Sequence, residues 1–331
     1  MGRVVLVTGV ARDLAARFAR HLADLAESGS DIDKVVGIDV VPPPGDLGGV
    51  KFVRADIRTP VVAKVMAVEE VDTVVHMGLV PSQRGTTVRG GAAKEFNVIG
   101  TMQLLAACQR ATSVRKLVAQ TSTAVYGTSP KDPAMFTESL SPRGGAKTGF
   151  PKDVVEAEGY IRGFARRRPD ILITTLRMAN ILSDQVVSPF GAYYQSAVLP
   201  TVMGFDPRIQ FLHEQDALNV LSESVVDDRP GTFNVAGDGV LLLSQTVRRL
   251  GKPILPLPPI GFGATASRIV RSMGSDIPPD LHRLLKYGRV VDTTALRDIF
   301  GYEPMFTTEA TFEAYRHKAK PGVFAMAGGR R

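Results

Sequence analysis

The chain has 331 residues, of which 44% are hydrophobic and 22% charged, as in an ordinary soluble globular protein of one large domain or two. No run of 18 or more apolar residues exists, so the sequence predicts no membrane-spanning helix. The net charge of +7 comes from scattered basic residues without the interleaved aromatic side chains that stack on bases, which argues against a nucleic-acid partner.

The first half of the chain alternates short β-branched runs with stretches of helical pattern, which predicts parallel strand–helix–strand units. Strands are expected at 4–7, 34–38, 50–53, 73–76, 116–119 and 171–176. Helices are expected near 13–26, 60–69, 90–111 and 152–167. We therefore expect an α/β fold, a Rossmann-like doubly wound parallel sheet whose ligands lie beyond the carboxyl ends of its strands.

The second half of the chain has a different pattern of predicted elements. Beyond residue 177 glycine and proline become frequent, and short strands at 209–212, 232–235 and 289–291 alternate with short helices. This pattern predicts a smaller mixed lobe that closes over the sheet. The sheet domain would take 1–177 and also 214–236, the substrate-binding lobe 178–213 and 237–323, and residues 324–331 would form a loose tail.

Cysteine and histidine usage limits the chemistry. Cys108 is the only cysteine, so no disulfide within the chain can form and a cytoplasmic location fits. An apolar strand pattern begins at Arg3 and leaves no room for a signal peptide. The five histidines show no metal-ligand spacing, so no metal site is expected.

The turn after the first strand, Val7-Thr8-Gly9-Val10-Ala11-Arg12-Asp13-Leu14-Ala15, stands where a dinucleotide-binding protein keeps its phosphate loop. Glycines let such a loop turn tightly and approach the pyrophosphate, which rests on the helix N-terminus. Only Gly9 is present, while Arg12 and Ala15 stand where the second and third glycines usually are. Taken alone, the turn fits a phosphate loop or an ordinary strand-to-helix connection.

Asp39 ends the second expected strand. A carboxylate there accepts hydrogen bonds from the ribose hydroxyls and repels a 2′-phosphate, which favours NAD over NADP as the cofactor. Arg12 keeps NADP open, since a guanidinium near the ribose can bind that phosphate instead.

Several short motifs follow one another in the order seen in extended short-chain dehydrogenase/reductases. They are Thr8-Gly9, Asp39, Arg54-Ala55-Asp56-Ile57, Val74-Val75-His76-Met77-Gly78, Asn97-Val98-Ile99-Gly100-Thr101, and the segments 121–127, 176–180, 210–216 and 231–235. Nearly the whole chain thus resembles the NAD-dependent epimerase/dehydratase group, and within it UDP-glucose 4-epimerase-like proteins of actinobacterial type. Measured against that group, the glycine loop is degenerate.

The resemblance implies roles for five residues of the cofactor site. Asp56 and Ile57 would border the adenine, with the Asp56 carboxylate accepting a hydrogen bond from the exocyclic amine. Met77 and Gly78 would flank the pyrophosphate, and Asn97 would hold a helix and a water in place near the active site.

The resemblance also places the reacting groups. Ser122 would hydrogen-bond the reacting hydroxyl or carbonyl, unless it only caps local backbone at the strand end. Lys152 would bond the nicotinamide ribose and activate a tyrosine four residues earlier, which takes a proton from the substrate hydroxyl. That position holds Thr148, a shorter and much weaker acid. The usual catalytic tyrosine of this motif is therefore missing, and the general acid/base is unassigned.

Other side chains are candidates for the substrate site. Tyr126, Tyr193 and Tyr194 are expected near the cleft, either replacing the missing tyrosine or packing a loop and lining the pocket. By the resemblance Asn180 would contact substrate, and Arg208 is a candidate for binding a diphosphate.

We therefore expect a NAD(P)-binding oxidoreductase or isomerase of the epimerase/dehydratase type that acts on a nucleotide sugar or another hydroxylated small molecule. Two alternatives stay open: a regulatory or interaction protein that keeps the fold without turnover, and a reductase or dehydratase of secondary metabolism with its own proton route. A homodimer is also expected, because the helices near 90–111 and 152–167 pair across a two-fold axis in proteins of this resemblance. Candidate contacts, which could instead face their own sheet, are Leu104, Leu105, Val155 and Ile161.

Overall fold

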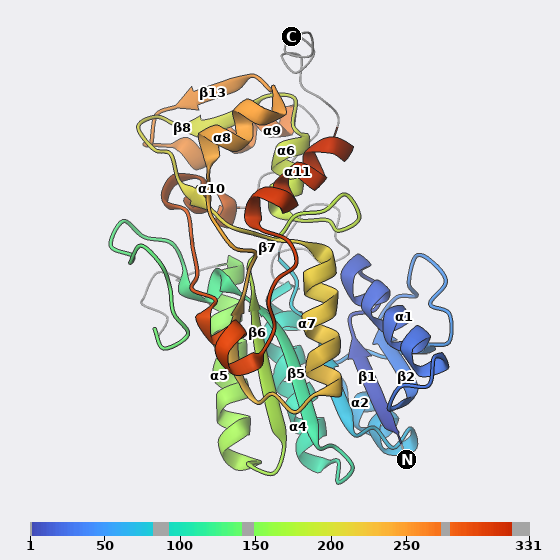
Figure 1. Ribbon diagram of the computed structural model, residues 1–331. Helices are drawn as coiled ribbons and strands as arrows, with labels where there is room; N and C mark the ends of the chain where they lie inside the picture. The colour runs from blue at the N-terminus through green and yellow to red at the C-terminus, as the bar shows by residue number, and fades with distance from the viewer. Residues whose placement is uncertain (1, 82–92, 141–148, 273–278, 320–331) are drawn as a thin grey trace.

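The computed structural model describes residues 2–81, 93–140, 149–272 and 279–319, which form a sheet flanked by helices with a smaller lobe above it (Figure 1). Thr148 and the tail expected over 324–331 lie outside these residues. Within the described part of the chain, no helix is both long and apolar enough to cross a membrane.

The central sheet has seven strands in the order β11-β6-β5-β4-β1-β2-β3, and all neighbouring pairs run parallel. The strands are β1 (Arg3–Thr8), β2 (Ile32–Asp39), β3 (Lys51–Arg54), β4 (Thr73–His76), β5 (Lys116–Ser122), β6 (Leu172–Met178) and β11 (Gly231–Val235). Strand order reverses between β1 and β4, the point at which doubly wound sheets open a crevice for ligands. The expected α/β fold is confirmed.

Helices cover both faces of the sheet (Figure 1). One face carries α1 (Asp13–Glu27) and α7 (Glu214–Val226), and the other carries α2 (Val61–Val68), α4 (Thr101–Arg110) and α5 (Gly149–Arg167). A π-helical turn, η1 (Glu95–Gly100), leads directly into α4. Along α1 the buried Leu14, Phe18 and Leu22 recur every four residues, so one stripe of this helix packs on the sheet.

The smaller lobe is built from short elements around an aromatic core. Its strands pair as β7 (Asn180–Ile181) with β10 (Phe211–Leu212), β9 (Arg208–Ile209) with β12 (Leu241–Leu242), and β8 (Leu199–Val202) with β13 (Ile254–Leu257). Its helices are α6 (Pro189–Gln195), α8 (Leu243–Leu250), α9 (Phe262–Ser272), α10 (Pro279–Tyr287) and α11 (Thr308–Lys318). Short helical turns also form at η2 (Thr123–Tyr126) and η3 (Leu296–Phe300). The core of the lobe centres on Phe190, Tyr194, Phe211 and Phe312.

The six strands expected in the first half are confirmed, as are the helices expected near 13–26, 60–69 and 152–167. Two details differ in the second half. Gln210 divides the strand expected over 209–212 into β9 and β10, and residues 289–291 make only isolated bridges, to Ile209 and Phe136. Although α7 and β11 lie with the sheet, the domain boundaries at 177, 213 and 236 stay predictions.

Candidate functional site

A cavity of about 680 Å³ opens beyond the carboxyl ends of the central strands, between the sheet and the smaller lobe. The sheet contributes the turn after β1, the end of β2, the segment after β4 and the ends of β5 and β6. Residues from the smaller lobe complete the wall, among them Pro189, Asp280, Leu284 and Arg289. This is the position in which a doubly wound sheet binds its ligand.

Gly9 makes the first turn. Its φ of +81° lies in the left-handed region that favours glycine, and a Cβ there would lie 3.0 Å from the Met77 carbonyl oxygen and overlap the Arg12 guanidinium. The backbone of the turn therefore approaches the end of β4 more closely than any other residue type would allow.

Arg12 precedes α1 and extends from this turn toward the end of β4. Its guanidinium donates hydrogen bonds to the carbonyl oxygen of Leu79, at 2.9 Å, and to that of Met77. Burial lowers the pKa of Arg12, and the nearby charge of Asp39 opposes that effect. The cationic group thus lines the cavity with carbonyl oxygens as its hydrogen-bond partners.

Asp39 lies in the cavity wall at the end of β2. Its carboxylate accepts hydrogen bonds from the backbone N–H groups of Ala11, at 3.0 Å, and Val40, at 2.7 Å. These two bonds fix the carboxylate beside the first turn, and each oxygen keeps a lone pair for a ligand.

Of the two residues expected to border the adenine, only one lines the cavity. Ile57 lines the cavity, whereas Asp56 is not among its lining residues. The Asp56 carboxylate instead pairs with Arg58, 2.7 Å from its Nη2, and hydrogen bonding to that guanidinium lowers the pKa of Asp56. A hydrogen bond from the exocyclic amine of adenine to the Asp56 carboxylate stays a prediction.

Met77 and Gly78 line the cavity beyond β4, and their expected contact with the pyrophosphate stays a prediction. The buried Asn97 does not line it but holds the neighbouring segment in place. Its side chain accepts from the Val80 N–H at 2.7 Å and donates to the Val80 carbonyl at 3.0 Å and to Asp153 Oδ2 at 2.9 Å. Asn97 therefore joins the loop after β4 to the start of α5.

Of the two described groups expected to react, only Ser122 is among the residues that line the cavity. Ser122 lines the cavity at the end of β5, where its Oγ accepts from the Ala124 N–H at 3.2 Å and so also caps η2. Lys152 is not among the cavity-lining residues; its Nζ lies 3.7 Å from Glu156 Oε1, and its side chain is 43% exposed. The residue of α5 that reaches the cavity is Phe150. The catalytic roles of Ser122 and Lys152 stay predictions, and that of Thr148 lies outside the described residues.

Two of the candidate tyrosines are interior residues of the smaller lobe. The hydroxyl of Tyr193 donates to the Pro200 carbonyl at 3.0 Å and that of Tyr194 to Thr246 Oγ1 at 2.9 Å. Both rings are fully buried, and burial raises the pKa of each phenol. Neither tyrosine is among the residues that line the cavity.

Of the two remaining candidates for substrate contacts, only Asn180 lines the cavity. Asn180 lines the cavity after β6. Arg208 does not; its exposed side chain donates to the Ala134 carbonyl at 2.7 Å.

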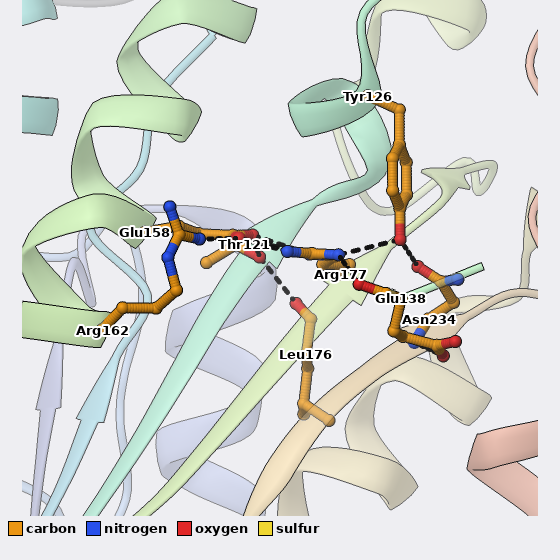
Figure 2. Close-up of polar contacts among 8 residues, drawn as sticks. All are labelled: Thr121, Tyr126, Glu138, Glu158, Arg162, Leu176, Arg177 and Asn234. Atoms are coloured by element: carbon orange, nitrogen blue, oxygen red, sulfur yellow. Dashed lines mark hydrogen bonds and ion pairs between the residues drawn. The ribbon is translucent and has the colours of Figure 1, made fainter. Parts of the chain in front are cut away.

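Tyr126 belongs to a buried polar network that ties α5 to the sheet (Figure 2). Its hydroxyl donates to Asn234 Oδ1 at 2.8 Å and accepts from Arg177 Nη1 at 2.9 Å. Arg177 also forms a buried ion pair with Glu158, with a closest distance of 2.6 Å. Burial acts to lower the pKa of Arg177, but the hydrogen bonds and charge of Glu158 outweigh it and raise that pKa. The network is structural support beneath the site.

Two ionisable cavity residues, Asp280 and Arg289, were not anticipated from the sequence. Burial raises the pKa of Asp280 to about 6 and lowers that of Arg289 to about 10. The Nε of Arg289 is buried and has no hydrogen-bond partner among the described residues. A lone arginine in the apolar run Gly288-Arg289-Val290-Val291 was the available signal for Arg289, whereas Asp280 follows two prolines like any helix-starting carboxylate.

In the described part of the chain, no cluster of three or more histidine, cysteine or acidic side chains could hold a metal ion. His76, which immediately precedes the cavity-lining Met77, is a buried structural residue. Its two ring nitrogens lie 3.0 Å from Thr8 Oγ1 and 2.9 Å from Thr101 Oγ1, and burial lowers its pKa to about 3.

Comparison with solved structures agrees with this architecture. MoeE5 in complex with UDP-glucuronic acid and NAD superposes with a TM-score of 0.72 at 18% identity, over 96% of this chain and 98% of that one. The dTDP-glucose 4,6-dehydratase DesIV of Streptomyces venezuelae, with NAD and TYD bound, gives 0.71 at 19% identity over 95% and 97%. The UDP-glucuronic acid 4-epimerase of Bacillus cereus in complex with NAD gives 0.69 at 17% over 95% and 99%. At these identities the likeness concerns the fold.

Sequence comparison identifies the family. Uncharacterized proteins of Mycobacterium tuberculosis (strain H37Rv) and Mycobacterium bovis are 43% identical over 319 residues, which is 95% of this chain and 83% of theirs. The model of the NAD dependent epimerase/dehydratase family matches residues 5–204. The chain therefore belongs to the NAD dependent epimerase/dehydratase family.

Proposed function

We propose that this protein binds NAD in the cavity and uses it to oxidise or isomerise a nucleotide sugar or another hydroxylated small molecule. The observation that carries the proposal is the convergence of the Gly9 turn, the Asp39 carboxylate and the segment after β4 on one cavity at the strand ends. Family membership supports the same reaction class.

The residues around the first turn fit a dinucleotide. A side chain at Gly9 would fill the cradle between the turn and Met77, and Asp39 is already oriented by two backbone N–H groups. Asp39 would bind the ribose hydroxyls and disfavour the 2′-phosphate of NADP. When bound, NAD would supply the acceptor or donor of a hydride.

The reaction end of the cavity would hold the substrate. Ser122 would donate a hydrogen bond to the reacting oxygen, because its Oγ lines the cavity at the end of β5. Arg289 would bind an anionic group such as a diphosphate, because its buried Nε is free to donate and it lines the same wall. A role for Lys152 at the nicotinamide ribose would require its side chain to leave Glu156 and turn inward.

A second candidate function is a dinucleotide-binding protein without turnover. It is favoured by the placement of Phe150, an apolar ring, where α5 reaches the cavity, and by the full engagement of Tyr126, Tyr193 and Tyr194 elsewhere. Mass spectrometry of ligands released on denaturation, followed by incubation with NAD and UDP-sugars, separates the two candidates. Product formation supports an enzyme, whereas bound NAD without product supports a binding protein.

We also propose a cytoplasmic homodimer. Of the contacts considered from the sequence, Leu104, Leu105 and Ile161 are buried against their own sheet. The outward positions of η1, α4 and α5 expose other large apolar side chains, namely Ile99, Met102 and Tyr160. Two copies could pair through these residues as a four-helix bundle. Sedimentation at micromolar concentration should show a dimer that Met102→Glu weakens, and a monomeric wild type would contradict the proposal.

A further inference from the structure

Asp280 brings a carboxyl group from the smaller lobe into the cavity at the start of α5. It stands in the first turn of α10, which packs against α5, and it lines the cavity together with Ser122 and Phe150. A Cβ on Gly149 would lie only 2.9 Å from Asp280 Oδ1. The carboxyl therefore sits directly against the first residues of α5.

Few cavity residues can exchange a proton. Among the described residues that line it, the ionisable ones are Arg12, Asp13, Asp39, Asp280 and Arg289. Asp13 and Asp39 flank the turn after β1, at the end of the cavity that would take the cofactor. The two arginines remain protonated at neutral pH. Asp280 is thus the remaining acid, and it faces the end formed by β5 and α5.

We propose that Asp280 is the general acid/base of this protein. The inference rests on the proposed function, an NAD-dependent reaction at a substrate carbinol. In the oxidative direction the carboxylate of Asp280 takes the hydroxyl proton as the C–H bond breaks, the carbinol becomes a carbonyl, and the hydride passes to NAD, which is reduced to NADH. In the reverse direction the protonated carboxyl returns its proton to the oxygen.

The surroundings of Asp280 suit this task. Burial disfavours its charged form, which the Phe150 backbone N–H and the charges of Arg289 and Arg283 stabilise, while Asp153 of α5 repels it. The resulting pKa of about 6 lies close to neutral pH, where a group can act as both acceptor and donor of a proton. An acid of this kind could take over the task of a missing phenol.

The test compares wild type with Asp280→Asn, which keeps the shape of the side chain but cannot exchange a proton. Asp298→Asn is the matched control, since Asp298 is exposed and lies away from the cavity. Each protein is incubated with NAD and either UDP-glucose, UDP-glucuronic acid or dTDP-glucose, and nicotinamide absorbance and products are followed from pH 5 to 8. Calorimetry measures NAD affinity, and infrared difference spectra record carboxyl protonation without any substrate.

We expect Asp280→Asn to lose about 10²- to 10⁴-fold in kcat with little change in KM or NAD affinity. A carboxyl band titrating near pH 6 and the acid limb of the pH–rate profile should both vanish in this variant and persist in Asp298→Asn. An Asp280→Asn variant as active as wild type would overturn the inference alone. A wild type that converts none of the three sugars would contradict a reaction on these nucleotide sugars, and with it the acid/base role of Asp280 in that reaction.

Discussion

The two ends of the cavity differ in how the chain builds them. At the end formed by β1, β2 and β4, residues close to the strand ends converge as expected: Gly9 makes the turn, Asp39 stands beside it and Met77 closes the wall. At the end formed by β5, α5 and the smaller lobe, the lining side chains include Phe150, Asp280 and Arg289. The first of these, the cofactor end, thus has the features typical of the fold. The second, the reaction end, is lined by side chains that the fold alone does not predict.

The buried ion pair of Arg177 with Glu158, which joins β6 to α5, gives the largest expected effect. Arg177→Met leaves Glu158 charged and buried with Thr121 as its remaining buried partner, so the free energy of unfolding should fall by about 3–5 kcal/mol. The control is Arg162→Met, which removes the exposed partner of the same Glu158, 3.5 Å away, and should cost no more than about 1 kcal/mol.

Urea unfolding of the two variants measures this difference. Because the network ties α5 to β5, β6 and β11, Arg177→Met should weaken ligand binding more at the end formed by β5 and α5 than at the end formed by β1, β2 and β4. Equal losses of stability in the two variants would show that the pair contributes nothing beyond a surface contact.

The acidity of Asp280 gives an effect confined to the reaction end. Its pKa rises from 3.8 to about 6 on folding, so between these values the folded protein binds more protons than the unfolded chain. The contribution of Asp280 to the free energy of unfolding therefore decreases as pH rises from about 4 to 6 and is constant above that. At pH 7.5 the free energy of unfolding of Asp280→Asn, measured with denaturant, should exceed that of wild type by about 2–3 kcal/mol at most. The difference should disappear near pH 4; a difference independent of pH would assign it to packing.

At the cofactor end the expected effect is smaller. Asp39→Ala removes charge-assisted hydrogen bonds to the ribose and should weaken NAD binding by about 1.5–3 kcal/mol while narrowing the preference over NADP. Asp33→Ala, at the exposed beginning of the same strand, should leave both affinities unchanged. Calorimetric titration of both variants with NAD and with NADP measures these affinities. If Asp39→Ala binds NAD as wild type does, Asp39 does not contact the ribose.

The contrast between the two ends also explains what the sequence could predict. Strands of a doubly wound sheet are continuous apolar runs, and the residue that follows each run lies at the cavity by geometry alone. Asp39 was found in this way, whereas Ser122 was assigned from the family resemblance. Arg289 and Asp280 reach the cavity through the tertiary contacts of short elements in the smaller lobe, which no local period in the sequence encodes.

Lys152 shows a second limit. A helix presents one face through residues spaced by three or four, and packing against its neighbours decides which face points inward. The inward face of α5 carries Phe150, Val154 and Glu158 at intervals of four. Lys152 lies two positions from Phe150 and therefore falls on another face. A motif match fixed the spacing of a catalytic pair but not the side of the helix on which it lies.

The most direct test of the account is titration of the wild-type protein with NAD, followed by the same titration in the presence of UDP-glucuronic acid. We expect saturable NAD binding at one site per chain, tighter than NADP binding. We also expect UDP-glucuronic acid to bind the NAD-loaded protein. Arg289→Met should weaken the binding of UDP-glucuronic acid and leave the binding of NAD unchanged. A protein that binds neither dinucleotide would contradict the central claim that this cavity is a cofactor site.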